Sequence, residues 1–382
     1  MTTYVPTFQG LSAIDFVRPP RRAAACFPFD APRLGFYRAR NAIYYLFKAL
    51  GGLKPRLVVL VPDYNSGNEV LALQAAGATL HFYRIGRDLQ PDVEQVEALC
   101  LKHDPDVLYV IHYLGWPQPL EPLAALCRRR TMLLVEDCAL SLLSAPGGRS
   151  LGAGGDFSVF CLYKTLPVPN GALLVQNTMP LDALDRLRFR QAGTVSVLGR
   201  VAELMAQRAR ARLNGVGAVL QTAKRTVGRA ATAIDVHRAT VGDIGFTLAD
   251  ADLGMSGATG RLLRRFDFSR IHQARAANFH ALAQAAKGHV TPLQPSLPQG
   301  ACPLFLPIVV GDKTAAARAL RAQGVQALEF WNHGAGGRVD GGADAQYLRT
   351  HVLALPVHQD LSRRHVEHMA SRLAALSSQL AA

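Results

Sequence analysis

The sequence predicts an α/β protein: a large domain with a mostly parallel sheet, a small C-terminal α/β domain and a basic helical insert. Two observations support this fold class. Short apolar strand patterns alternate with helical patterns from residue 36 onward, and 382 residues are more than one typical domain needs. Hydrophobic residues make up 49% of the chain and charged residues 18%, which excludes a disordered or collagen-like protein.

The elements of the large domain follow one another in a regular order. The first long helix is expected over residues 40–50, where apolar residues recur at helical spacing before Gly51 and Gly52. Further helices are predicted over 68–77, 91–103 and 121–130, and strands over 57–62, 79–85, 107–113, 132–137, 157–163 and 172–177. Because these strands are continuous apolar runs, the sheet is expected to be parallel and covered on both faces.

We expect three parts: a large domain over residues 1–185, an arginine-rich helical insert over 186–245, and a small C-terminal domain over 246–382. Apolar residues recur at roughly helical spacing within the insert, which predicts two basic amphipathic helices that break near Asn214 and Gly215. The C-terminal part is predicted to contain helices at 258–286, 313–323 and 361–380 and strands at 304–310, 325–330 and 352–357.

The chain is strongly basic, with a formal net charge of +14 from 42 Lys and Arg against 28 Asp and Glu. This excess is compatible with nucleic acid, an anionic membrane surface or a phosphorylated substrate. No nucleic-acid-binding motif accompanies it, so specific nucleic-acid binding is not expected. Residues 186–240 hold much of the excess, and they form either a solvated helical pair or a peripheral contact with an anionic membrane.

Cysteine usage indicates a reducing compartment. The six cysteines form no CxxC pair and no His/Cys metal spacing, so neither a disulfide framework nor a metal site is expected. No stretch of about 18 apolar residues is present, which argues against a membrane span. We therefore expect a cytoplasmic protein, with possible peripheral attachment at the inner membrane face through 186–240.

Three useful groups are expected at one edge of the sheet. Asp137 ends an apolar strand, Lys164 ends a later strand, and residues 38–41 open the first long helix, whose free N–H groups favour an anion. Open parallel sheets bind ligands at the carboxyl ends of their strands. A lysine for a Schiff base, a carboxylate for the pyridine nitrogen and a phosphate cradle are what pyridoxal phosphate requires. A helix cap for Asp137 and a solvated surface position for Lys164 remain the alternatives.

Several segments occur in an order typical of one known family. They are RARNAIYYLFKALG (38–51), VPDYNSGNEV (61–70), VIHYLGWP (110–117), VEDCALS (135–141), GDFSVFCLYKTLPVPNGALLV (155–175), DLGMSGATGRLLRRFDF (252–268) and ALPVHQDLS (354–362). Together they resemble the DegT/DnrJ/StrS family of sugar aminotransferases. This resemblance implies the type I fold of pyridoxal-phosphate-dependent transferases, the fold of aspartate aminotransferase.

The resemblance also implies roles for individual residues. Lys164 maps to the Schiff-base lysine and Asp137 to the partner of the pyridine nitrogen, which makes these two the catalytic candidates. The other candidates for cofactor binding are Arg40, Asn41, Tyr64, Asn65, Ser141 and Cys161, with Tyr64 the nearest aromatic ring for stacking on the cofactor. No metal is implied.

Three histidines are candidates for substrate contacts on their positions alone. His112 follows a strand pattern, His333 lies just after a strand end, and His358 follows a strand and Pro356. For each of them a satisfied structural role is the alternative, since histidines of this kind are often held by hydrogen bonds within the protein.

The sequence departs from the family at three places. Leu140 stands where the family usually has a glutamine near the pyridine ring, and Cys161 replaces the serine before the lysine. The Asn-x-Arg-Met motif is Asp252-Leu253-Gly254-Met255. The comparison with the family therefore supports cofactor binding better than it supports ordinary transamination.

The function implied is transfer of an amino group, most often from glutamate, to a keto-sugar carried on a nucleotide, for surface polysaccharide or related glycan biosynthesis. The type I fold implies a homodimer with a shared active site. Two alternatives stay open: a pyridoxal-phosphate enzyme of another reaction type, such as a sugar dehydratase, and a non-catalytic homologue that acts as a scaffold in polysaccharide assembly.

Overall fold

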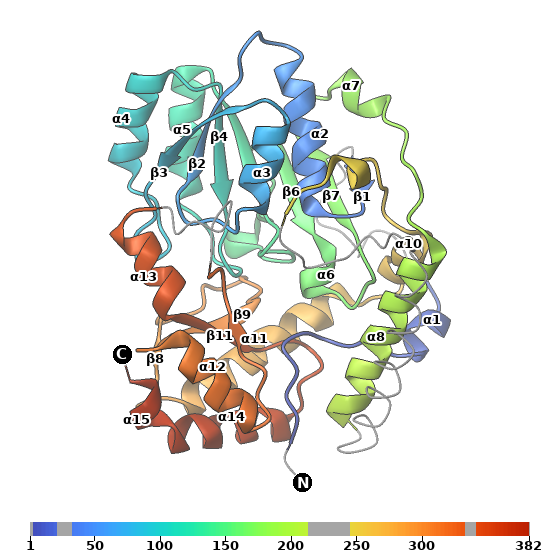
Figure 1. The fold of residues 1–382 in the computed structure, drawn as a ribbon, viewed down its shortest axis with the longest axis vertical. Helices are drawn as coiled ribbons and strands as arrows, with labels where there is room; N and C mark the ends of the chain where they lie inside the picture. The colour runs from blue at the N-terminus through green and yellow to red at the C-terminus, as the bar shows by residue number, and fades with distance from the viewer. Residues whose placement is uncertain (1–2, 21–32, 213–244, 333–340, 382) are drawn as a thin grey trace.

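A seven-stranded sheet forms the upper half of the molecule (Figure 1). The computed structural model describes residues 3–20, 33–212, 245–332 and 341–381. The strands are β1 (Arg33–Phe36), β2 (Val58–Pro62), β3 (Thr79–Tyr83), β4 (Val107–Ile111), β5 (Leu133–Asp137), β6 (Phe157–Cys161) and β7 (Ala172–Gln176), in the order β1-β7-β6-β5-β4-β2-β3. Strand β7 runs antiparallel to its two neighbours β1 and β6, and the other neighbouring strands of this sheet pair in parallel. The predicted mostly parallel sheet is confirmed.

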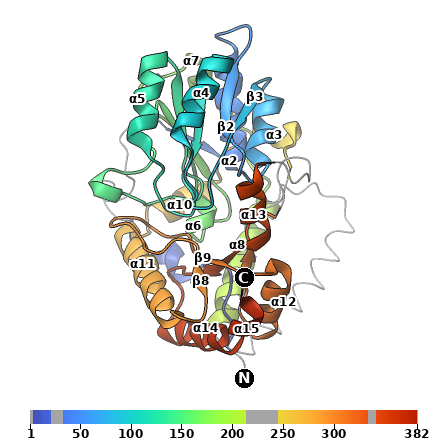
Figure 2. The same cartoon turned by 90° about the vertical axis from the view of Figure 1, so that its left-hand side faces the viewer.

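Helices cover both faces of this sheet, as the apolar strands require. The covering helices are α2 (Ala39–Gly51), α3 (Asn68–Ala75), α4 (Val93–His103) and α5 (Leu120–Arg130). Helices α2 and α3 pack on each other, and α4 packs on α5 (Figure 2). All four predicted helices of this region are present, within two residues or so of the expected bounds.

The connection after β6 differs from the prediction. The strand expected over 157–163 ends at Cys161, and the one-turn helix α6 (Leu162–Thr165) follows. Lys164 therefore lies on a helical turn beyond the strand rather than on the strand itself. The remaining short helices of the N-terminal half are α1 (Ile14–Val17), α7 (Asp182–Asp185) and the 3-10 turn Pro146–Gly148.

The C-terminal part contains a four-stranded antiparallel sheet in the order β10-β11-β9-β8. Its strands are β8 (Thr291–Pro292), β9 (Phe305–Val309), β10 (Leu328–Glu329) and β11 (Val352–Pro356); a 3-10 turn Leu248–Asp250 precedes it, and its helices are α10 (Gly257–Leu263), α11 (Phe268–Ala285), α12 (Lys313–Ala322), α13 (Ala343–His351), α14 (Arg363–Ala375) and α15 (Ser377–Leu380).

Two predictions for this part were wrong. The single helix expected over 258–286 is broken, because the Asp267 side chain accepts a hydrogen bond from Arg270 N and begins the new helix α11. The strand expected over 325–330 is reduced to the two residues of β10. The domain boundaries at 185 and 245 stay a prediction.

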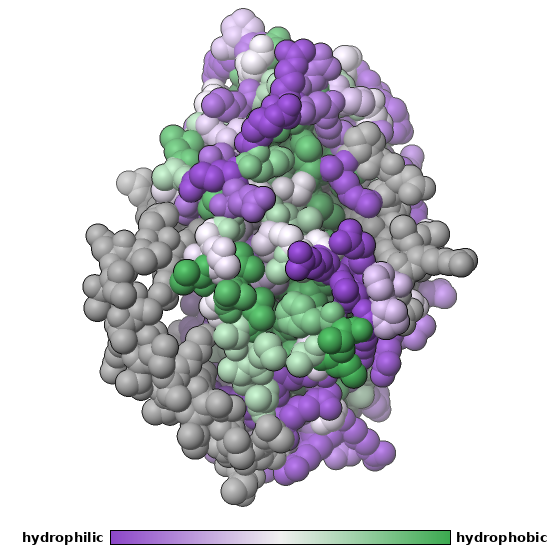
Figure 3. Space-filling model, turned by 90° about the vertical axis from the view of Figure 1, so that its right-hand side faces the viewer, coloured by the Kyte–Doolittle hydropathy of each residue, from purple (hydrophilic) through white to green (hydrophobic). Residues whose placement is uncertain are grey.

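The basic insert begins with the helix α8 (Thr194–Arg212). Its exposed apolar side chains are Val195, Leu198 and Met205, at 56%, 61% and 36% exposure. On the side of the molecule to which α8 belongs, apolar residues gather near the middle, with hydrophilic ones above and below (Figures 1 and 3). The second predicted helix of the insert, beyond Asn214, lies outside the described residues. Among the described helices, none is long and apolar enough to cross a bilayer.

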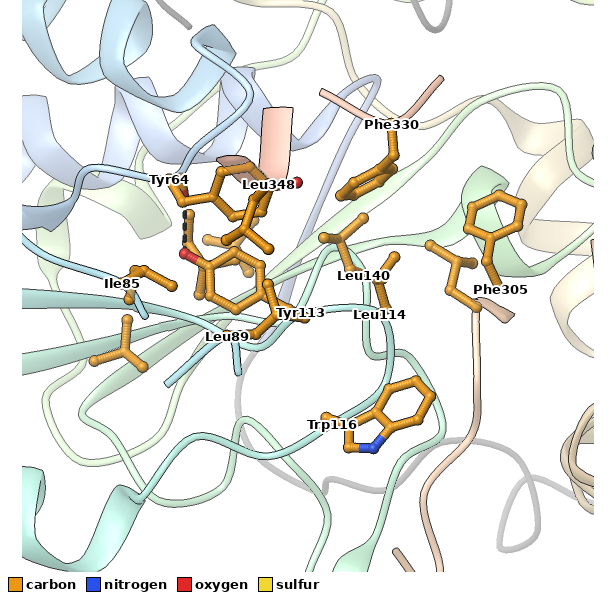
Figure 4. Packing of buried hydrophobic residues seen from close by; sticks show 14 of the residues in the cluster. Tyr64, Ile85, Leu89, Tyr113, Leu114, Trp116, Leu140, Phe305, Phe330 and Leu348 are labelled. Carbon is orange, nitrogen blue, oxygen red and sulfur yellow. Dashed lines mark hydrogen bonds between the residues drawn. The ribbon is translucent and has the colours of Figure 1, made fainter. Parts of the chain in front are cut away.

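One continuous hydrophobic core joins the two sheets. Tyr64 and Tyr113 follow strands of the large sheet, and they pack with Leu348 and Phe330 from the C-terminal part (Figure 4). The hydroxyl of Tyr113 donates a 2.6 Å hydrogen bond to the carbonyl oxygen of Tyr64. Buried apolar side chains of both parts therefore meet at this joint.

Arg275 of α11 adds a polar contact to this joint. Its side chain is 1% exposed, and burial lowers its pKa to about 10. The guanidinium donates to side-chain oxygens of Gln9 and Gln359 at 3.0 and 2.9 Å. It also donates to the carbonyl oxygens of Thr165, Pro303 and Leu304 at 3.2, 3.1 and 3.2 Å. A single cation therefore joins the N-terminal segment, the turn after Lys164 and the C-terminal part.

Replacing Arg275 with methionine is expected to destabilise the protein by about 3 kcal/mol, because several buried oxygens lose their donor. Denaturant unfolding followed by circular dichroism measures the change. Arg270→Met, at an exposed position on the same helix, is the matched control and should change stability by less than about 0.5 kcal/mol. Equal stability of the two variants would contradict the role given to Arg275.

Candidate active site

A cavity of about 630 Å³ lies where β4, β5 and β6 end. Its wall on the sheet side is formed by Ile111, Asp137, Ala139, Leu140, Cys161, Tyr163 and Lys164, and by Ala39, Arg40, Ser66, Asn68 and Glu69 from the starts of α2 and α3. The other lining residues include Arg200, Glu203 and Gln207 of α8 and residues 328–332. The parallel sheet thus brings Asp137 and Lys164 together at the edge expected from the sequence.

Asp137 is the last residue of β5 and is 5% exposed. One carboxylate oxygen accepts a 2.6 Å hydrogen bond from the Tyr109 hydroxyl, and the other accepts 2.8 Å from Ala139 N. Burial and the neighbouring Glu69 carboxylate raise the pKa of Asp137 to about 6, although Tyr109, Ala139 and Lys164 favour the charged form. Without a cationic ligand in the cavity, this carboxylate is therefore destabilised.

Lys164 lies on α6, and its backbone is held from two sides. The Gln9 side chain donates to the carbonyl oxygens of Tyr163 and Lys164, both at 3.4 Å. Arg275 holds the carbonyl of the next residue, Thr165. Cys161 also lines the cavity, and burial raises the pKa of its thiol, so it is a neutral group in the wall.

The start of α2 provides an anion cradle at the cavity. The residue before the helix, Arg38, is extended and makes no side-chain cap, and no acidic residue stands in the first turn. Ala39 and Arg40 of this turn line the cavity, and Arg40 donates a 3.0 Å hydrogen bond to Asn68 Oδ1. The partial positive charge of the helix start and the guanidinium together suit a phosphate group.

Four other residues predicted to bind the cofactor do not line this cavity. Asn41 is turned to the carbonyl of Asp250 at 2.7 Å. Tyr64 packs on Tyr113 and Trp331, with ring centres 5.6 and 5.1 Å away.

The other two of these residues are used in backbone contacts. Asn65 donates to Pro62 O and accepts from Gly67 N at 2.9 and 3.0 Å. The Ser141 hydroxyl donates to His112 O and accepts from Gly115 N at 2.7 and 3.2 Å. These side chains hold the turns that surround the cavity.

Two of the three histidine candidates, His112 and His358, are buried and make hydrogen bonds within the protein. His112 is fully buried: Nε2 lies 2.8 Å from Glu136 Oε2, and Nδ1 accepts from Gln118 N at 3.0 Å. Cys138 lies close enough to His112 and Glu136 for a metal, but the hydrogen bonds already use the ring nitrogens and both carboxylate oxygens. His358 is 2% exposed and contacts Pro6 O at 3.0 Å. His333 lies outside the described residues.

Four charged residues that line the cavity were not predicted as site residues: Glu69, Arg200, Glu203 and Glu329. Glu69 caps the turn before α3, accepting from Ser66 N at 2.8 Å, and its charge acts on Asp137. The Ser-x-x-Glu spacing of Ser66 and Glu69 is a capping-box pattern that a search for caps would have found. Arg200 has no such signal, because spacing does not tell which helix covers a distant strand end.

Comparisons with known proteins match part of the chain to one sequence family. The sequence model described as the DegT/DnrJ/EryC1/StrS aminotransferase family matches residues 38–205. A GDP-perosamine synthase of Vibrio cholerae is 30% identical over 142 residues, which are 36% of this chain and 38% of that protein. A dTDP-4-dehydro-2,3,6-trideoxy-D-glucose 4-aminotransferase of Saccharopolyspora spinosa is 25% identical over 147 residues, 38% of each. The matches thus span well under half of these curated relatives.

Solved structures share the whole fold. A putative sugar aminotransferase of Streptococcus pneumoniae, described as a PLP form, has a TM-score of 0.67 at 12% identity and covers 98% of this chain and 99% of its own. The sugar aminotransferase CalS13 of Micromonospora echinospora has a TM-score of 0.65 at 15% identity, with coverages of 97% and 99%. These comparisons confirm the fold class and the resemblance found in the sequence.

Asp137→Asn is expected to stabilise the cofactor-free protein above pH 6, by up to about 3 kcal/mol. The pKa of Asp137 is about 6 in the folded state, against 3.8 for an ordinary aspartate. Stability that the protonated carboxyl supplies is thus lost as the pH rises between these values, and asparagine avoids the loss. Melting temperatures at pH 4 and pH 8 measure it: a gain at pH 8 that is absent at pH 4 supports the assignment, whereas equal gains contradict it.

Proposed function

We propose that this chain is a pyridoxal-phosphate-dependent aminotransferase of the DegT/DnrJ/EryC1/StrS family, whose sequence model matches residues 38–205. It transfers an amino group from glutamate to a keto-sugar carried on a nucleotide, for glycan biosynthesis. The observation that supports this best is the single cavity lined by Lys164, Asp137 and the start of α2. The curated relatives that act on nucleotide sugars support the substrate class.

The residues of the cavity fit the cofactor. Pyridoxal phosphate supplies an electron sink that stabilises charge at the substrate carbon. Asp137 would accept a hydrogen bond from the protonated pyridine nitrogen, whose positive charge would offset the burial that raises the pKa of this carboxyl. The start of α2 and Arg40 would hold the phosphate, and the Lys164 amine would be the group that anchors the cofactor and carries a proton.

Leu140 favours a second candidate, a pyridoxal-phosphate enzyme of another reaction type such as a sugar dehydratase. The side chain lines the cavity, so the place where the resemblance leads us to expect a glutamine amide is apolar. A scaffold without catalysis is disfavoured, since Lys164 and Asp137 both face the same cavity.

Lys164→Ala is expected to remove the visible absorbance that bound cofactor gives the purified protein at about 410–430 nm. Glutamate should bleach this band in the unchanged protein if amino transfer occurs. Lys287→Ala, at an exposed position after α11, is the matched control and should keep the band. Absence of any band after addition of pyridoxal phosphate would overturn the proposed function, and a band insensitive to amino donors would favour the second candidate.

We also propose a cytoplasmic homodimer that touches an anionic membrane through residues 186–240. The five described cysteines are all free and buried, which suits a reducing compartment. Exposed Leu198 and Val195 on α8 offer apolar contact area, and arginines of the same helix offer positive charge.

Leu198→Glu tests both associations, because it places a charge at the 61% exposed apolar position of α8. Sedimentation velocity measures the dimer, and cosedimentation at low salt with neutral or anionic vesicles measures membrane binding. A monomeric unchanged protein would contradict the dimer, and equal recovery with both vesicle types would contradict the membrane contact. If the variant loses only dimerisation or only membrane binding, the exposed face of α8 takes part in the association that is lost.

A further inference from the structure

One face of α8 forms part of the wall of the cavity that Asp137 and Lys164 line. Arg200, Glu203 and Gln207 line the cavity, and their spacing of three and four residues places them on the same side of a helix. We infer that Arg200 binds the anionic oxygen group of a substrate in this cavity. This inference rests on the proposed function and assigns a specificity role to the insert.

Helix α8 is held firmly against the rest of the chain. Leu204 is 3% exposed, and its carbonyl accepts a 3.1 Å hydrogen bond from Leu11 N. Arg208 forms an ion pair with Asp360, and the Gln207 side chain donates to the carbonyl of Phe8. These contacts hold α8 in place over the two turns that follow Arg200, and so keep this part of the helix at the cavity.

Arg200 is oriented but not saturated. Nη1 lies 2.9 Å from Glu203 Oε2, one turn along the helix, and the Arg200 side chain is 25% exposed. Its Nε is buried and has no hydrogen-bond partner among the residues that the structure describes. A guanidinium has five N–H donors in a fork that matches carboxylate or phosphate oxygens. The pair with Glu203 aims the fork and leaves donors for a ligand.

Anion binding at this place depends on the donors of the Arg200 guanidinium and not on the net charge of the cavity. Among the described residues, the basic side chains that line the cavity are Arg40, Lys164 and Arg200, and the acidic ones are Glu69, Asp137, Glu203 and Glu329. The proposed function uses Arg40 for the cofactor phosphate and Lys164 for the covalent anchor, so Arg200 is the one left for substrate. Two substrate groups have the matching chemistry: the carboxylate of the amino donor and the diphosphate of the nucleotide sugar.

Arg200→Gln tests the inference in two separate arms. The first arm measures the glutamate concentration that reduces the absorbance of the cofactor band by half. The second arm measures the binding of GDP and dTDP by calorimetry. We expect a loss of about tenfold or more in one arm, with partial recovery in Arg200→Lys, which keeps the charge but not the fork. Loss in the glutamate arm assigns the donor carboxylate, and loss in the nucleotide arm assigns the diphosphate.

Arg212→Gln, at an exposed position on the same helix and outside the cavity wall, is the matched control and should change neither arm. If Arg200→Gln changes neither the glutamate response nor the nucleotide affinity, the inference is overturned. The proposed function still stands in that case, provided that the unchanged protein shows the cofactor band. If the unchanged protein shows no band, the proposed function fails. The calorimetric arm then decides alone, because it needs no cofactor, and equal nucleotide affinities would overturn the inference.

Discussion

The buried carboxylate of Glu136 holds together the sheet edge on which the cavity is built. It accepts hydrogen bonds from Gly152, Gly154 and Gly155 N at 2.9, 2.7 and 2.6 Å, and it lies 2.8 Å from His112 Nε2. These contacts join the residue after β4, the end of β5 and the turn that leads into β6. Because successive strand residues face opposite sides, this clamp leaves Asp137 directed to the cavity.

Two adjacent carboxylates of one strand therefore have opposite properties. Burial alone would raise the pKa of Glu136, but His112 and the glycine N–H groups hold it below the ordinary value. Asp137 has fewer donors and the Glu69 charge nearby, so its pKa is raised. The first carboxylate stabilises the fold, whereas the second is kept at a cost to stability, as is common at functional sites.

Features that follow from the order of strands and helices could be predicted from the sequence. Features that depend on the direction of individual side chains could not. Alternating strands and helices place Asp137 and Lys164 at the same edge whatever their neighbours are, so both could be found. The same motifs contain Asn65 and Ser141, which turn into backbone contacts that spacing does not reveal. Arg200 reaches the cavity only because α8 packs across it, and this packing involves contacts between residues far apart in the chain.

The continuous core has a consequence for how the molecule can change. Curated relatives match only within 36% to 38% of the chain, whereas the solved structures follow nearly all of it. Tyr64 and Tyr113 are buried in one cluster with Phe330 and Leu348 of the C-terminal part. A fragment that ends with the first sheet would therefore expose a large hydrophobic patch to water. Exchanging one half for that of a related protein would therefore disturb the packing at the joint. Substitutions at the joint are tolerated only where they keep its apolar volume.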